Sequence, residues 1–147
     1  MIGLGWWGST IIKTLKESKK IKIIAGVDID EEHGEKFTKE YNIKFYKHID
    51  DALGDPKIKA IIIATPHGIH EEMFLASVKA GKEIFCEKPF ALTSVAARNM
   101  ISQAEAKGIT IGIGHERRFE GAFEEIKRVV DTGELGTLLH LEFNASY

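Results

Sequence analysis

The sequence predicts an α/β protein built on a doubly wound parallel sheet. Short apolar runs alternate along the chain with segments whose apolar residues recur at helical spacing. Apolar runs of this kind are typical of parallel strands that helices cover on both faces. The chain also opens on closely spaced glycines between a strand remnant and a helix, which is a second sign of this fold class.

Gly3, Gly5 and Gly8 fit the pattern G-x-G-x-x-G. In this pattern the first glycine permits a tight turn, the second lets the backbone approach a pyrophosphate, and the third lets the next helix lie close to the sheet. The helix that follows would point its N-terminal N–H groups at the phosphates. The match alone is weak, because 14 glycines can produce this spacing by chance.

Asp28 supplies the context that strengthens the glycine pattern. It ends a predicted buried strand, residues 21–27, and follows Gly8 by 20 residues, which is close to the spacing at which an acidic residue meets the adenosine ribose. Its charge would repel a 2′-phosphate, and no basic residue follows directly, so the sequence favours NAD over NADP. Alternatively, Asp28 or Asp30 caps the next helix, and Asp30, with two glutamates after it, is the better cap. The unit as a whole indicates a Rossmann dinucleotide-binding domain.

The strand that should precede Gly3 is short, because only Met1 and Ile2 stand before it. In a doubly wound sheet this strand is central, and strands usually run about five or six residues. An upstream start codon, a shortened chain and a tolerated stub all remain open.

The rest of the chain continues the alternation. After the strand at 21–27 we expect a helix at 31–41, a strand at 44–46, a helix at 49–54, a strand at 59–65, a helix from Ile69 to Ala80, a strand at 83–86, a helix through Ala97 to Ala104, a strand at 110–114, a helix at 119–130 and a strand at 138–145. Residues 1–118 would form the NAD-binding domain and residues 119–136 a connecting helix. Residues 137–147 would be the first strand of a truncated second α/β domain, which serves substrate binding and oligomerisation.

Bulk properties exclude several classes of protein. The 147 residues are 44% hydrophobic and 29% charged, as in a globular domain, and the net charge of −2 gives no electrostatic case for nucleic acid or a membrane. One cysteine, Cys86, allows neither a disulfide framework nor a cysteine-based metal site. The sequence has no signal peptide and no long apolar run, so we expect a cytoplasmic location.

Polar residues follow three of the predicted strands, where ligands of open α/β sheets bind. Thr65, Pro66 and His67 follow one strand, with His70 nearby; Glu87, Lys88 and Pro89 follow the next; and residues 115–119 follow the last. Each group also has an explanation without a ligand. The histidines could lie at the surface at a helix start, Lys88 could belong to a surface turn, and the arginines could pair with neighbouring glutamates. A lysine at a strand end can hydrogen-bond a substrate hydroxyl.

These residues resemble the Gfo/Idh/MocA oxidoreductases, the relatives of glucose-fructose oxidoreductase and inositol dehydrogenase. The resemblance is carried by A-T-P-H-G-I-H from Ala64, by E-K-P at Glu87, by the opening I-G-L-G-W-W-G, by Asp28, and by Arg118 with the later G-E-L-G. It implies a cofactor site made of Gly3, Leu4, Gly5, Trp6, Trp7, Gly8, Asp28, Thr65, Pro66, His67, His70, Glu87, Lys88 and Arg118. It also implies that Asp28 holds the adenosine ribose, that Thr65, Pro66, His67 and Glu87 surround the nicotinamide ribose, and that His70 lies beside the cofactor. Lys88 would be the catalytic residue that orients the reacting hydroxyl, and its bond to Pro89 would be cis.

The chain departs from this family after Tyr147, because members continue into a second domain that supplies the substrate pocket, an acid/base histidine in D-x-x-x-H and the usual oligomer interface. The resemblance therefore implies the nucleotide-binding part of an NAD-dependent oxidoreductase of sugars or polyols. A non-catalytic NAD-binding fragment is the alternative, and NAD-dependent glycoside cleavage is a third reading. We expect a homo-oligomer through residues 137–145, because an unpaired strand exposes backbone groups and an apolar row.

Overall fold

The computed structural model describes residues 1–144 and divides the chain into two compact units, residues 1–114 and the residues from His115 onward. The strands of the first unit are β1 (Ala25–Val27), β2 (Lys44–Tyr46), β3 (Ala60–Ile63), β4 (Glu83–Glu87) and β5 (Ile111–Gly114). The helices are α1 (Trp6–Leu15), α2 (Glu31–Tyr41), α3 (Ile49–Gly54), α4 (His70–Lys79) and α5 (Ser94–Ala106), with a 3-10 turn η1 (His67–Ile69). The second unit holds a 3-10 turn η2 (Glu116–Phe119) and α6 (Gly121–Asp131).

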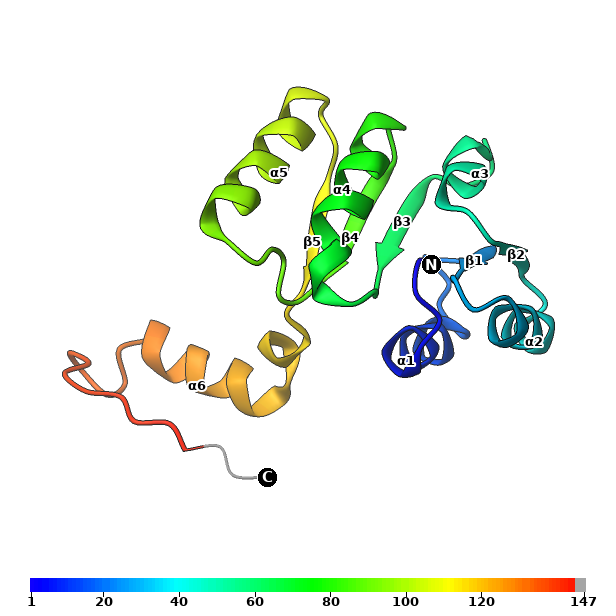
Figure 1. The fold of residues 1–147 in the computed structure, drawn as a ribbon. Helices are drawn as coiled ribbons and strands as arrows, with labels where there is room; N and C mark the ends of the chain where they lie inside the picture. The colour runs from blue at the N-terminus through cyan, green and yellow to red at the C-terminus, as the bar shows by residue number, and fades with distance from the viewer. Residues whose placement is uncertain (145–147) are drawn as a thin grey trace. The chain divides into compact units, whose positions relative to one another are not determined.

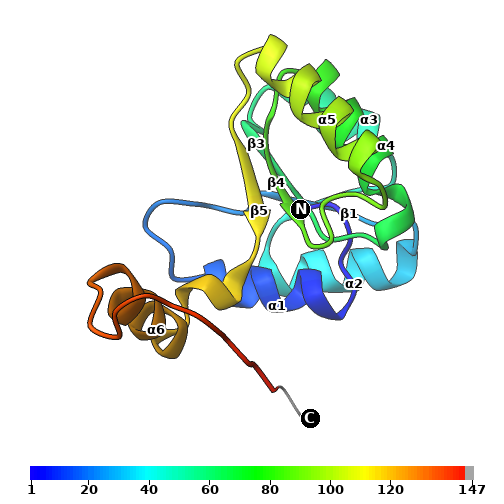
Figure 2. The ribbon, with the colours of Figure 1, turned by 90° about the vertical axis from the view of Figure 1, so that its left-hand side faces the viewer.

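All strand pairs of the first unit are parallel. β1 pairs with β2, and β4 lies between β3 and β5. Ile2 joins the two groups, because it forms parallel bridges to both Val27 and Ile63. The resulting order is β2–β1–Ile2–β3–β4–β5, with α1 and α2 on one face and α3, α4 and α5 on the other (Figures 1 and 2). This is the predicted doubly wound sheet of a Rossmann-like fold.

The core lies on both faces of this sheet. A larger cluster includes Ile2, Ile61, Phe74 and Met100, while a smaller one packs Leu4, on the other face, beneath α1 and α2. Local signals place the helices: the Asp30 carboxylate accepts from the His33 N–H at 3.0 Å, which is the predicted cap of α2. Thr93 caps α5 in the same way, through the Ala96 N–H.

Three predicted elements differ from the structure. The strand expected at 21–27 is regular only from Ala25, because the backbone that pairs with its inner edge, residues 1–3, bonds only to Ala25 and Val27 among the described residues. The helix expected from Phe119 begins at Gly121, after the turn η2. Residues 137–144 have no strand, since a strand forms only beside a paired neighbour, and residue 145 onward lies outside the described residues.

Candidate functional site

The carboxyl ends of the parallel strands gather the glycine loop and two further loops at one edge of the sheet. Gly3 has φ +86°, and a Cβ at this position would lie 2.7 Å from the Ala64 carbonyl oxygen, so the glycine loop runs directly against the loop after β3. A Cβ at Gly8 would collide with the Gly3 carbonyl. Gly3 and Gly8 therefore let the backbone of the loop fold against itself and its neighbour.

Gly5 has a different environment from the other two glycines of the pattern. A Cβ at this position would meet no described atom within 4 Å. Gly5 is also the N-cap of α1, and no side chain caps that helix end. The N-terminus of α1 therefore has no side-chain cap beside open space, and an anion is favoured there by the helix dipole.

Asp28 holds the glycine loop from the end of β1. One of its carboxylate oxygens accepts from the Leu4 N–H at 2.7 Å, and the other accepts from the Asp30 N–H at 3.0 Å. An ionised carboxylate can accept about four hydrogen bonds, so two backbone donors leave room for ribose hydroxyls. Asp28 is half-buried, and its carboxylate is thus oriented before any ligand binds.

Two residues that support the glycine loop were missed by the sequence reasoning. His33 of α2 lies with Nε2 3.1 Å from the Leu4 carbonyl oxygen, and the Ser9 hydroxyl donates to the same oxygen at 2.9 Å. Neither belongs to the glycine pattern, and only the sheet topology brings α2 beside the loop. Leu4 itself, predicted to bind the cofactor, has its side chain in the core and both backbone groups bonded to the protein.

The loops after β3 and β4 lie side by side because these strands pair in register, with Ile63 opposite Cys86. Pro66 and His67 are exposed, and Thr65 is half-buried. Lys88 and Pro89 are exposed in the next loop, and the peptide bond between them is cis, as the resemblance implied.

His70, which the resemblance places beside the cofactor, is buried at this edge. Its side chain is 0% exposed, so in this conformation it cannot touch a cofactor or lie at the surface. Its Nε2 lies 2.9 Å from the Thr65 carbonyl oxygen, and its Nδ1 lies 2.9 Å from that of Pro89. It therefore lies behind the two loops, and its place beside a cofactor stays a prediction.

Glu87 is the acidic residue of the second loop and is only 6% exposed. It is the last residue of β4, and a Cβ at Gly114 would come within 2.5 Å of its carboxylate oxygens. Its Oε2 accepts from the Lys88 N–H at 3.3 Å. Gly114 thus provides the space in which the Glu87 carboxylate lies, a role that sequence spacing does not reveal.

Two buried polar atoms at this edge have no hydrogen-bond partner among the described residues: Trp7 Nε1 and Thr65 Oγ1. Buried polar atoms are usually paired, so a pair of unpaired ones fits a region that receives a polar ligand. Trp6, on the same first turn of α1, is 81% exposed, and its ring centroid lies 5.4 Å from that of Trp7.

Arg118 belongs to the second unit, in η2, and its place in the site stays a prediction. Among the described residues, no group of three or more His, Cys, Asp or Glu side chains could hold a metal ion. None of the helices in the described range is long and apolar enough to span a bilayer.

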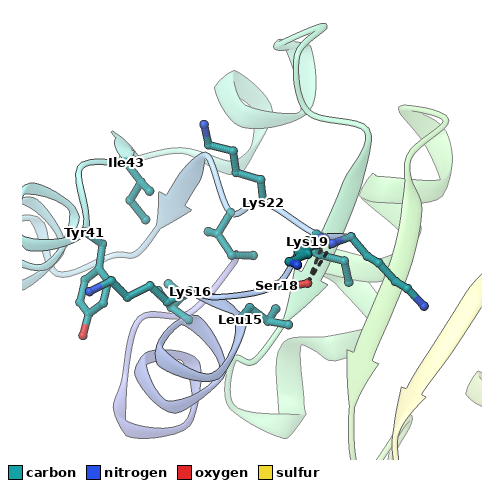
Figure 3. A pocket seen from close by; sticks show the side chains of 11 residues that line it. Leu15, Lys16, Ser18, Lys19, Lys22, Tyr41 and Ile43 are labelled. Carbon is teal, nitrogen blue, oxygen red and sulfur yellow. Dashed lines mark hydrogen bonds between the residues drawn. The ribbon is translucent and has the colours of Figure 1, made fainter.

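A hollow of about 440 Å³ lies at the opposite edge of the sheet, by the end of α1 and the segment before β1 (Figure 3). It has an apolar floor and four lysines on its rim, Lys16, Lys19, Lys20 and Lys22, none of which forms an ion pair with a described residue. Lys16 and Lys22 extend in different directions, so they do not converge on one anion (Figure 3). This hollow is separate from the loops described above.

Comparison with known proteins matches this arrangement to a family. The sequence model of GFO_IDH_MocA, described as "Oxidoreductase family, NAD-binding Rossmann fold", matches residues 1–115. The chain belongs to this oxidoreductase family. The expectation drawn from the glycine loop, Asp28 and E-K-P is thereby confirmed.

Individual relatives cover the same part of the chain. It is 31% identical to inositol 2-dehydrogenase 1 of Saccharopolyspora erythraea over 92% of this chain and 42% of that protein. It is 31% identical to an uncharacterized oxidoreductase, YrbE, of Bacillus subtilis over 93% of this chain and 40% of the relative. Scyllo-inositol dehydrogenase of Lactobacillus casei, solved with NAD(H) and scyllo-inositol, superposes with a TM-score of 0.85 at 25% identity, over 92% of this chain and 41% of that one. The chain thus spans about two fifths of the length of these relatives.

Proposed function

We propose that this chain is the nucleotide-binding part of an NAD-dependent oxidoreductase that acts on a CH–OH group of a sugar, a polyol or a related small molecule. The observation that carries the proposal is the set of contacts at the carboxyl edge, where Asp28 orients the glycine loop in front of the open space at Gly5. Two relatives named above are inositol dehydrogenases, which supports the substrate class.

The residues of this edge suit the parts of NAD. The uncapped turn of α1 would hold the pyrophosphate, Asp28 the adenosine ribose, and the loops at Thr65 and Glu87 the nicotinamide end. The bound cofactor supplies the hydride acceptor. Lys88 would donate a hydrogen bond to the reacting oxygen and hold the substrate in line, while removal of the hydroxyl proton needs a base within hydrogen-bond reach.

Preference for NAD over NADP follows from Asp28. The carboxylate would accept from both ribose hydroxyls and repel a 2′-phosphate, and the next residues, Ile29 and Asp30, offer no positive charge. Calorimetric titration of NADH and NADPH against the chain tests this preference. We expect NADH to bind more tightly than NADPH. Asp28→Ala should weaken NADH binding about tenfold and narrow the difference between the affinities for NADH and NADPH. Equal or tighter NADPH binding by the unaltered chain would contradict the proposal.

Gly5 and Gly8 offer a matched pair that separates ligand contact from folding. Gly5→Ala adds a methyl group to space that the protein leaves open, so we expect a folded chain with weaker NADH binding. Gly8→Ala places a Cβ against the Gly3 carbonyl, and we expect a loss of about 2 kcal/mol or more of folding stability. Urea unfolding followed by circular dichroism, together with the titration, measures both. If Gly5→Ala bound NADH as well as the unaltered chain, the pyrophosphate would not lie there.

The role of Lys88 needs a form that turns over substrate. In a longer form that carries a substrate domain, Lys88→Ala should lower kcat strongly and leave NAD affinity nearly intact, because its side chain is exposed in the loop after β4. Equal losses of binding and turnover would assign Lys88 a structural role. The 147 residues alone should bind NAD with no more than trace turnover of polyols, which matches the alternative of a non-catalytic NAD-binding fragment. A cytoplasmic location and homo-oligomerisation stay predictions from the sequence.

A further inference from the structure

We infer that His70 is a positioning residue that couples the loop after β3 to the loop that carries Lys88. It is the first residue of α4 and is completely buried, with its ring between the two loops. The Thr65 and Pro89 carbonyl oxygens, one from each loop, lie 2.9 Å from its two ring nitrogens. No other side chain among residues 1–144 donates or accepts hydrogen bonds with both loops.

In both contacts a ring nitrogen of His70 faces a carbonyl oxygen. A carbonyl oxygen can only accept a hydrogen bond, so a ring nitrogen of His70 donates to its carbonyl when it carries the ring proton. The Cys86 thiol, 3.6 Å from Nδ1, is the next polar neighbour, and the His67 ring lies edge-on with centroids 5.7 Å apart. Hydrogen bonds in such a buried place are costly to leave unmade, so the ring resists separation of the loops.

The coupling of these two loops would matter for catalysis because of where they lie. β3 and β4 are adjacent strands, and the two loops leave them on either side of the His70 ring. This step rests on the proposed function, in which one loop lines the nicotinamide ribose and the other presents Lys88 to the substrate. His70 would then set the separation between cofactor and substrate groups without touching either, and small errors in such a separation are expensive for catalysis.

Two conservative substitutions separate the two contacts. The amide nitrogen of Asn lies near the position of Nδ1, and that of Gln lies near the position of Nε2, so His70→Asn keeps a donor toward Pro89 and His70→Gln keeps one toward Thr65. Ser77→Ala is the matched control, because Ser77 is also buried on α4 but bonds only to its own helix, at Met73.

Amide hydrogen exchange of the chain without cofactor is the first measurement. We expect His70→Asn to raise exchange about tenfold or more at residues 65–69, and His70→Gln to do so at residues 87–92, with neither change in Ser77→Ala. Both His70 variants should also bind NADH several-fold more weakly by calorimetry. Uniform acceleration in all three variants, or no local change, would overturn the coupling.

A second measurement needs no variant and covers the case in which the substitutions prevent folding. Nitrogen–proton NMR of the folded chain should show at least one ring N–H proton of His70 that exchanges slowly with solvent. Ring protons that all exchange rapidly with solvent would show that the ring holds neither carbonyl and would overturn the inference. If the unaltered chain failed to bind NADH, the proposed function would fail, while the exchange pattern and the ring protons would still decide the role of His70.

Discussion

The two units of the chain respond differently to the same kind of sequence signal. α5 and α6 both have apolar residues at helical spacing, and both form. In α5 the residues Met100 and Ala104 are buried against the first unit's core, whereas no residue from His115 to Asn144 is buried. Helical periodicity therefore predicts where a helix forms. Whether its apolar face is buried depends on another part of the protein that packs against it, which the periodicity does not reveal.

The second unit has exposed ion pairs on its surface. Arg128 pairs with Glu125 and Glu134, which raises the pKa of the Arg128 guanidinium and lowers the pKa of both carboxylates. Exposed ion pairs of this kind contribute little to stability. The first unit instead combines two buried clusters with a paired sheet, so the two regions should differ sharply in their sensitivity to substitution.

The largest expected effect comes from the core of the first unit. Phe74 is 0% exposed, and Phe74→Ala should cost about 3–5 kcal/mol of unfolding free energy through lost burial and a cavity. Ile126 of α6 is 50% exposed, and Ile126→Ala should cost no more than about 1 kcal/mol. Urea unfolding by circular dichroism measures both, and similar losses in the two variants would break the comparison.

The reactivity of thiols gives a second contrast. Burial, with a smaller effect of Glu87, raises the pKa of the Cys86 thiol from 9.0 to about 12. The thiolate is the reactive form, so near neutral pH Cys86 should react roughly a thousandfold more slowly than an unperturbed cysteine. A cysteine introduced by Ile126→Cys should react at the ordinary rate, and rapid modification of Cys86 in the folded chain would contradict its burial.

The sign of the pH dependence follows from the same shift. At pH values below 9 the thiol is protonated in both the folded and the unfolded chain, so its contribution to stability is constant there. At higher pH only the unfolded chain ionises, and its contribution declines as the pH rises toward 12. The extra loss of stability on going to alkaline pH should be absent from Cys86→Ala, and this variant is the control.

The smallest expected effect on folding comes from removing the end of the second unit. Leu135, Leu138, Leu139, Leu141 and Phe143 are exposed there, and such a run favours association between copies. Deletion of the residues after Thr132 should shift the chain toward monomer in light-scattering measurements and leave NADH affinity unchanged. An undeleted 147-residue chain that is already monomeric at high concentration would contradict the predicted association.

Much of the first unit could be predicted from the sequence because its signals are local. The helix at 31–41 and the strand at 44–46 have the predicted bounds. The signals that predict them, the Asp30 cap and the apolar stripe of the helix and the aromatic pair of the strand, each act within a few residues. The strand at 21–27 was predicted too long, because the length of a strand depends on the neighbour that pairs with it rather than on its own residues.

The candidate site divides in the same way. Gly3, Gly8 and Asp28 could be found from spacing, because their tasks belong to one strand–turn–helix unit. His33, Gly114 and the internal position of His70 could not, since each depends on which helix or strand the topology places beside a loop. The resemblance to a family identified His70 as a site residue, but only the structure shows that its side chain is buried behind the loops.

The first turn of α1 also determines what can be seen of this protein in solution. Trp6 and Trp7 are the only tryptophans of the chain, and both lie on that turn. The tryptophan fluorescence of the chain therefore comes only from the first turn of α1, in the first unit. The second unit has no tryptophan and adds nothing to this signal. Circular dichroism sees the helices of both units. A melting curve that differs between the two methods would show the units unfolding in separate steps, and coincident curves would show one cooperative transition.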